Sequence, residues 1–170
     1  INESTAELIS EQETLNIKRS VLYVLDVPSN DDVKETYASV IVESNFEDQI
    51  YYEYMKDGTL SGYAFPYTGT GLWGSISGYI AFSPDFSEIL GIDFVAHSET
   101  PGLGGRIDEL SFKEQFRGLT IQNEDTIIFK PSEGGNIDGI TGATLTSDAV
   151  RNIINAFITD ILSFAKEANL

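Results

Sequence analysis

The sequence predicts an α+β fold, in which a twisted, mainly antiparallel sheet is flanked by helices, with one long helix at each end of the chain. Three observations favour this class. Aromatic-rich runs in the middle of the chain have the character of strands. Short turns separate these runs, so neighbouring strands pair antiparallel. Both ends of the chain carry segments of helical character.

The composition is that of a packed and strongly acidic protein. Of the 170 residues, 41% are hydrophobic and 11% aromatic, which suits one domain with a sizeable core. The 27 acidic residues outnumber the 10 basic ones, and the net charge of −17 repels nucleic acid. With no cysteine and one histidine, disulfides, thiolate sites and His-rich metal sites are excluded. We therefore expect no nucleic-acid partner and no metal site.

Residues 1–45 are interpreted as an N-terminal helical segment. Residues 5–25 mix charged and apolar positions and predict a long helix, which the proline-containing stretch 27–30 ends. Asp31 or Asp32 then caps a second helix, whose buried stripe consists of Val33, Tyr37, Val40 and Ile41. Residues 46–170 are expected to form the main domain, and both parts are expected to belong to one compact unit.

The central part of the chain predicts two strand pairs. Asp57-Gly58 lies between the first two runs and is a strong hairpin signal. A glycine-rich connection over residues 69–74 separates the pairs. The four predicted strands cover residues 50–55, 60–65, 75–82 and 88–96.

The last third predicts shorter elements before a long final helix. In order, we expect a loop over 97–105, a short helix around 110–116, two short strands near 119–122 and 126–129, and a polar loop over 130–139. Apolar residues at helical spacing then predict an amphipathic helix with one buried face, formed by Val150, Ile153, Ile154, Phe157, Ile158, Ile161, Phe164 and Ala165.

A flexible, hydroxyl-rich turn precedes this final helix. Gly139 and Gly142 allow a tight turn, and the four hydroxyl side chains are at Thr141, Thr144, Thr146 and Ser147. The unpaired N–H groups and the positive dipole end of a helix N-terminus favour phosphate. The simpler interpretation is an ordinary N-cap, worth about 1 kcal/mol. A single cap, however, needs only one hydroxyl.

The stretch Glu99-Thr100-Pro101-Gly102-Leu103-Gly104-Gly105 is the second unusual feature. Three glycines and a proline predict a compact loop with exposed backbone groups, against which a flat ligand can lie. On composition alone, this stretch is an ordinary connection between a strand and a helix.

These two stretches resemble one known family. Asp138-x-x-Thr141-Gly142-Ala143-Thr144 matches every specified position of the flavinylation motif Asp-x-x-(Ser/Thr)-Gly-Ala-Thr. It resembles the FMN-binding domain found in the C subunit of the sodium-translocating NADH:quinone reductase and in the G subunit of the Rnf electron-transport complex. The loop over residues 99–104 is similar to the family's ring-contacting loop. Further similar stretches are Gly71-Leu72-Trp73-Gly74 and Phe112-Lys113-Glu114-Gln115-Phe116.

The resemblance implies specific roles for residues of both stretches. Thr144 would carry FMN through a phosphoester bond, and Asp138 would belong to the sequence that a FAD- and magnesium-dependent flavin transferase recognises. Glu99 would accept from a ring N–H or cap the next turn, and Trp73 would pack beside the flavin or within the protein. The cofactor-binding residues implied are Trp73, Glu99, Thr100, Leu103, Gly104, Thr141, Gly142, Ala143 and Thr146.

The function implied is electron transfer within a membrane complex, by a redox subunit that turns over no substrate itself. Residues 46–170 would be the FMN-binding domain, with other subunits of the complex as partners. The domain would face the periplasm or the cell exterior. The chain begins at Ile1 without an initiator Met. Because the resembled subunits carry an N-terminal membrane helix, we expect attachment to the membrane only through an anchor missing from this sequence.

Two alternatives remain open from the sequence. The glycine-rich loops could form a non-catalytic interaction module of a membrane complex, with Thr144 only a helix cap. The same pocket could also bind FMN without a covalent bond. Hydrolysis is disfavoured, because a chain with one histidine offers no Ser/His/Asp set.

Overall fold

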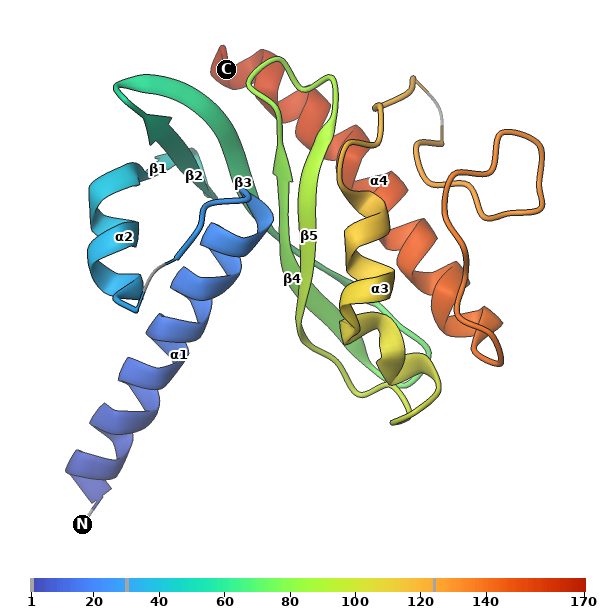
Figure 1. Cartoon of the computed structure of the whole chain (residues 1–170), viewed down its shortest axis with the longest axis horizontal. Coiled ribbons are helices and arrows are strands. Elements are labelled where there is room, and N and C mark those ends of the chain that lie inside the picture. Colours follow the sequence, from blue (N-terminus) through green and yellow to red (C-terminus); the bar gives the residue numbers. More distant parts are fainter. Residues whose placement is uncertain (1, 30, 124) are drawn as a thin grey trace.

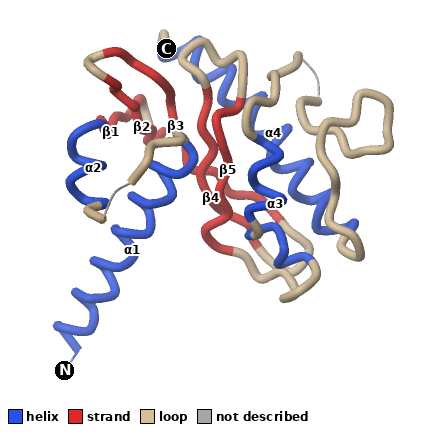
Figure 2. Tube along the Cα trace, viewed as in Figure 1, coloured by secondary structure: helices blue, strands red, loops and turns tan. Residues whose placement is uncertain are grey.

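A five-stranded antiparallel sheet with the order β1-β2-β3-β4-β5 organises the fold (Figures 1 and 2). The computed structural model describes residues 2–29, 31–123 and 125–170. The strands are β1 (Ile41–Phe46), β2 (Gln49–Lys56), β3 (Thr59–Thr70), β4 (Ser75–Phe82) and β5 (Ile89–Ala96). The predicted α+β class and antiparallel pairing are confirmed.

Helices cover both faces of the sheet (Figure 1). α1 (Asn2–Val24) and α2 (Val33–Val40) lie on one face, and α4 (Thr144–Ala168) lies on the other. Short helical turns follow β5, namely η1 (Gly104–Asp108), α3 (Leu110–Lys113) and η2 (Glu114–Phe116). Among the described residues, no helix is both long and apolar enough to cross a membrane.

Successive side chains along the strands point to opposite faces of the sheet, which divides the core into two clusters. In β4, Ile80 packs with α4 and the short helices, whereas Tyr79 and Ala81 pack with α1 and α2. This follows from the two-residue period of a strand, which points successive side chains to opposite faces. The aromatic residues collect mostly in the α4 cluster, which holds the larger part of the core.

The predicted hairpin is confirmed, and its turn explains the Asp57-Gly58 signal. Both residues have positive φ, 51° and 76°, as a two-residue hairpin turn with the sheet's own twist requires. All four predicted strands form, with β3 extending to Thr70. Of the predicted connection over 69–74, only the part after Thr70 remains a turn, closed by the Gly71 N–H donating to the Gly74 carbonyl at 2.7 Å.

β1 was not predicted, and it changes the end of the N-terminal segment. Asp32 caps α2 as expected, its carboxylate accepting from the Glu35 N–H at 3.0 Å. The helix ends at Val40, however, and residues 41–46 pair with β2. Ile41, predicted to lie on the helix stripe, begins this strand. The segment mixes three apolar with three polar residues and does not alternate strictly, so its conformation depends on pairing with β2. Of the predicted break at 27–30, Asn30 lies outside the described residues.

The two short strands predicted near 119–122 and 126–129 do not form. Within the described residues, these segments contain isolated bridges, Glu88 with Thr120 and Phe129 with Ile137. The first segment makes backbone hydrogen bonds, of Leu119 with Ile89 and of Ile121 with Ser87, which do not extend into a strand. In the second, side chains take the place of a partner strand: the Ile127 N–H donates to Asn155 Oδ1 at 2.8 Å, and the Ile128 N–H donates to Asn136 Oδ1 at 3.0 Å. The prediction was wrong because β-favouring residues alone do not supply a neighbouring strand.

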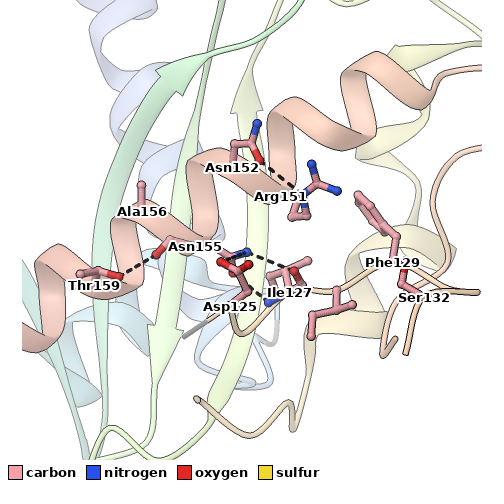
Figure 3. A pocket seen from close by; sticks show the side chains of 10 residues that line it. Asp125, Ile127, Phe129, Ser132, Arg151, Asn152, Asn155, Ala156 and Thr159 are labelled. Carbon is pink, nitrogen blue, oxygen red and sulfur yellow. Dashed lines mark hydrogen bonds between the residues drawn. The ribbon is translucent and has the colours of Figure 1, made fainter. Parts of the chain in front are cut away.

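Asn155 of α4 fixes this segment from both sides (Figure 3). Besides accepting from the Ile127 N–H, its Nδ2 donates to the Ile127 carbonyl at 3.1 Å. We predict that Asn155→Ala lowers the free energy of unfolding by about 2 kcal/mol, because both backbone groups of a buried residue lose their partner. Urea unfolding measures this.

Asn152→Ala is the matched control for this prediction. Asn152 is exposed on the same helix, and within the described residues its side chain makes one hydrogen bond, accepting from Arg151 Nε at 3.3 Å. Its loss is expected to cost less than about 0.5 kcal/mol. Equal effects of the two substitutions would contradict the role given to Asn155.

Candidate functional site

A pocket of about 450 Å³ lies where three separate segments meet at one end of the sheet. The β3–β4 turn, the loop after β5 and the start of α4 each contribute to its wall. The lining residues are Leu72, Trp73, Thr100, Leu103, Gly104, Gly142, Ala143, Thr144, Leu145 and Thr146. All residues predicted to contact a cofactor are therefore brought together in this wall, except Glu99 and Thr141.

The pocket carries an unusual amount of exposed apolar surface. Four large side chains of its wall are 43–66% exposed: Leu72, Trp73, Leu103 and Leu145. Leu72 and Leu145 were missed as site residues, although each adjoins a predicted one in sequence. Apolar walls with a few polar groups are typical of small-molecule sites, so the pocket suits a ligand with a large apolar part.

Glu99 lies beneath this pocket instead of in its lining. It is only 4% exposed, and both carboxylate oxygens are engaged by the protein. Oε1 accepts from the backbone N–H groups of Leu72 and Trp73 at 3.0 and 3.2 Å, and Oε2 accepts from the Thr146 hydroxyl at 2.6 Å. The geometry therefore favours a supporting role for Glu99 over the predicted contact with a ring N–H.

Two glycines make room for this arrangement. A Cβ at Gly71 would lie 2.6 Å from Glu99 Oε1, and a Cβ at Gly104 would overlap the Thr146 side chain. Both positions therefore need a residue without a side chain. These glycines, which the sequence placed in a glycine-rich connection and in a compact loop, act here by allowing close approach.

The hydroxyl groups of the turn differ in burial and in hydrogen bonding. Thr146 and Ser147 are buried; Ser147 Oγ donates to the Ala143 carbonyl and accepts from the Ile140 N–H, both at 3.0 Å. The N-cap of α4 is Ala143, and no side chain caps the helix. Thr144 is therefore not the cap that the simpler interpretation required. Its side chain is exposed beside the pocket, and among the described residues its hydroxyl makes no hydrogen bond.

Asp138 and Thr141 belong to the same turn and are exposed, but they do not line the pocket. Both line a smaller groove of about 170 Å³. The backbone of Asp138 is held by Gln115, whose Oε1 accepts from the Asp138 N–H at 2.7 Å, while the exposed carboxylate lies 3.6 Å from Lys130 Nζ. Asp138 and Thr141 are thus accessible from solvent without opening the pocket.

A larger cavity, about 540 Å³, lies between α4 and the segment 125–132 (Figure 3). Two of its main polar side chains already bond to the protein: Asn155 holds Ile127, and Arg151 pairs with Asp148 at 3.1 Å. This cavity therefore follows from how the segment is attached to α4. It is a weaker candidate than the pocket at Thr144.

The sequence profile of the FMN-binding domain family matches residues 71–159, which include every residue of the pocket wall. The chain belongs to this family. The C subunit of the Na⁺-translocating NADH-quinone reductase of Pseudomonas aeruginosa is 32% identical over 113 residues, covering 60% of this chain and 43% of that protein. The G subunit of the ion-translocating oxidoreductase complex of Methanosarcina acetivorans is 37% identical over 103 residues, covering 61% and 53%. The chain spans about half the length of these relatives.

Solved structures of this family share the fold. The C subunit of the Na⁺-translocating NADH-quinone reductase from Parabacteroides distasonis superposes with a TM-score of 0.70 at 26% identity, covering 85% of this chain and 89% of that one. NqrC from Shewanella oneidensis gives 0.71 at 21% identity, covering 83% and 89%. The likeness extends well beyond the stretch that the family profile matches.

We predict that Glu99→Ala lowers the free energy of unfolding by about 3 kcal/mol, because two backbone N–H groups and a buried hydroxyl lose a charged acceptor. Glu99→Gln, which keeps one carbonyl acceptor, is expected to cost about 1 kcal/mol. Urea unfolding of both variants measures the difference. Glu109→Ala, which removes an exposed carboxylate paired with Arg106, is the control and should change stability by less than about 0.5 kcal/mol.

Proposed function

We propose that this chain is the flavin-carrying, electron-transfer domain of a membrane-bound, ion-translocating oxidoreductase, and that FMN is joined to Thr144 through a phosphoester bond. The observation that carries the proposal is the state of Thr144. Its exposed hydroxyl is free of protein partners within the described chain and lies at the edge of an apolar pocket, whereas the hydroxyls of Thr146 and Ser147 are buried and bonded.

The residues present fit FMN. The apolar walls formed by Leu72, Trp73, Leu103 and Leu145 suit the isoalloxazine ring, and Thr100 offers it a hydroxyl. The phosphate belongs at Thr144, where the first N–H groups of α4 have no side-chain cap and the helix dipole is positive. Gly142, at φ 80°, gives the turn the left-handed conformation that glycine adopts readily. In this proposal, Glu99 holds the β3–β4 turn and the start of α4 together.

Attachment requires a separate enzyme. A threonine hydroxyl is a weak nucleophile, and within the described chain no base is hydrogen-bonded to Thr144. We assign the step to a flavin transferase that uses FAD and magnesium. The Thr144 oxygen forms a bond to the FMN phosphorus, the pyrophosphate bond of FAD breaks, AMP leaves and the hydroxyl proton is released. The accessible Asp138 and Thr141 suit recognition by such an enzyme.

Bound FMN supplies the redox chemistry, accepting and passing on electrons. The chain's own residues orient the ring, cover its faces and prevent its loss through the ester. Esterification also leaves the phosphate a singly charged diester, which suits a chain of net charge −17. The relatives are named as subunits of ion-translocating complexes, and we propose other subunits of such a complex as partners. We place the domain on the periplasmic or outer side of the membrane, reached through an N-terminal anchor.

The first test is the intact mass of the protein after co-expression with a flavin transferase. We expect a gain of one FMN less one water in the wild type and in Thr144→Ser, which keeps a hydroxyl, and no gain in Thr144→Val. An unmodified wild type beside a positive control substrate would overturn the covalent assignment. Flavin that binds but washes away on denaturation would establish the non-covalent alternative. A chain that takes up no flavin in either form would support the interaction module.

Asp138→Asn is predicted to slow flavinylation about tenfold or more, because the transferase loses a carboxylate that the motif specifies. Folding should not change, since this carboxylate is exposed and only its 3.6 Å contact with Lys130 is lost. Timed mass spectrometry measures the rate. Glu133→Gln, an exposed carboxylate in the same polar loop, is the control and should be flavinylated at the wild-type rate.

A further inference from the structure

His97, the single histidine, joins Glu99 to Asp108. Its Nδ1 lies 3.1 Å from the Glu99 backbone nitrogen, and its Nε2 lies 2.8 Å from Asp108 Oδ2. A backbone N–H can only donate, so Nδ1 must accept and carries no proton. The hydrogen-bond network therefore assigns the neutral tautomer with the proton on Nε2, which donates to Asp108.

We propose that His97 is a positioning residue for the pocket: its neutral form holds the backbone of Glu99, and its protonation releases that backbone and loosens the site. The pocket's use for FMN rests on the function proposed above. The hold on Glu99 is a property of the chain itself and can be measured without flavin.

The physical reason is a conflict between two donors. Protonation places an N–H at Nδ1, facing the Glu99 N–H across 3.1 Å, so the bond between them is replaced by repulsion. Either the ring turns or the Glu99 backbone moves. Any movement of Glu99 reaches Leu72, Trp73 and Thr146, because its carboxylate holds all three and all three line the pocket.

The packing around Glu99 leaves little room to absorb such a movement. Gly71 approaches the carboxylate so closely that a Cβ would lie 2.6 Å from Oε1, and Gly104 packs directly against Thr146. Glu99 itself is 4% exposed. A displaced Glu99 must therefore shift its neighbours or give up hydrogen bonds to them.

Within the described residues, the charged group in contact with the His97 ring is the carboxylate of Asp108. Asp108 of η1 faces Nε2, and Arg106 of the same turn is occupied by Glu109 at 3.2 Å. In β3, burial above all, and then the negative charges of Asp93 and Asp108, raise the pKa of Tyr67 well above its ordinary value, so Tyr67 stays neutral. Histidine is the side-chain type that changes charge between about pH 5 and 8.

The test is an NMR titration of the uniformly ¹⁵N-labelled protein without flavin, from pH 8 to pH 5. With one histidine, the ring signals need no assignment. We expect the Nε2-protonated tautomer at pH 8, and amide shifts of Leu72 and Trp73 that change with the same midpoint as the ring. Riboflavin binding, measured by fluorescence, should weaken about fivefold over the same range, the effect of losing one hydrogen bond.

Two variants distinguish the effect of His97 protonation from a general loss of stability at low pH. In His97→Asn, Oδ1 replaces the Nδ1 acceptor but does not titrate, so the amide shifts of Leu72 and Trp73 should stay constant from pH 8 to 5. In Asp108→Asn, the side-chain oxygen that accepts from Nε2–H remains but the carboxylate is lost. The amide shifts of Leu72 and Trp73 should therefore still follow the ring, which would exclude protonation of Asp108 as their cause.

Amide shifts that stay constant while the ring titrates would overturn the proposal, as would a His97→Asn variant with the wild-type midpoint. The two proposals fail separately. If the amides follow His97 but no flavin binds at any pH, positioning of Glu99 stands and the FMN function falls. If flavin binds equally at all pH values with constant amide shifts, His97 has no positioning role and the FMN function stands.

Discussion

The buried carboxylate of Glu99 is the interaction on which the site depends. Burying a carboxylate is costly unless hydrogen bonds compensate it, and here two backbone amides and one hydroxyl do so. Those three donors belong to the β3–β4 turn and to α4, while Glu99 itself lies in the loop after β5. One side chain therefore holds together three segments that are far apart in the sequence. The cost of its burial makes the arrangement specific, because any other arrangement leaves a charge without partners.

The sheet explains why these segments meet. Because β3, β4 and β5 are consecutive antiparallel neighbours, the β3–β4 turn and the end of β5 lie at the same edge of the sheet. α4 packs across one face of the sheet (Figure 1). Its first residue, Thr144, lines the same pocket as the β3–β4 turn and the loop after β5. The apolar stripe of α4 thus does more than fill the core: it sets where the hydroxyl-rich turn lies.

The same contacts divide the hydroxyl groups of that turn into two kinds. Thr146 is bound to Glu99, and Ser147 bridges Ile140 and Ala143, so both stabilise the start of the helix from inside. These hydrogen bonds stabilise the start of the helix, and Thr144 does not act as its N-cap. Within the described chain the Thr144 hydroxyl makes no hydrogen bond, which is consistent with the attachment role that we propose for it.

The sequence by itself determined the α+β class, the four central strands and both long helices. Each of these elements depends on local patterns, such as the Asp57-Gly58 turn or the apolar stripe of α4, which act between residues near in sequence. The segments that line the pocket were indicated by the resemblance to a known family. Only the tertiary structure decided three features. Residues 41–46 form a strand, the strands predicted near 119–122 and 126–129 do not form, and the Glu99 side chain is buried beneath the pocket. The reason is that these depend on partners far along the chain: Asn155 is 28 residues from Ile127, and Thr146 is 47 residues from Glu99.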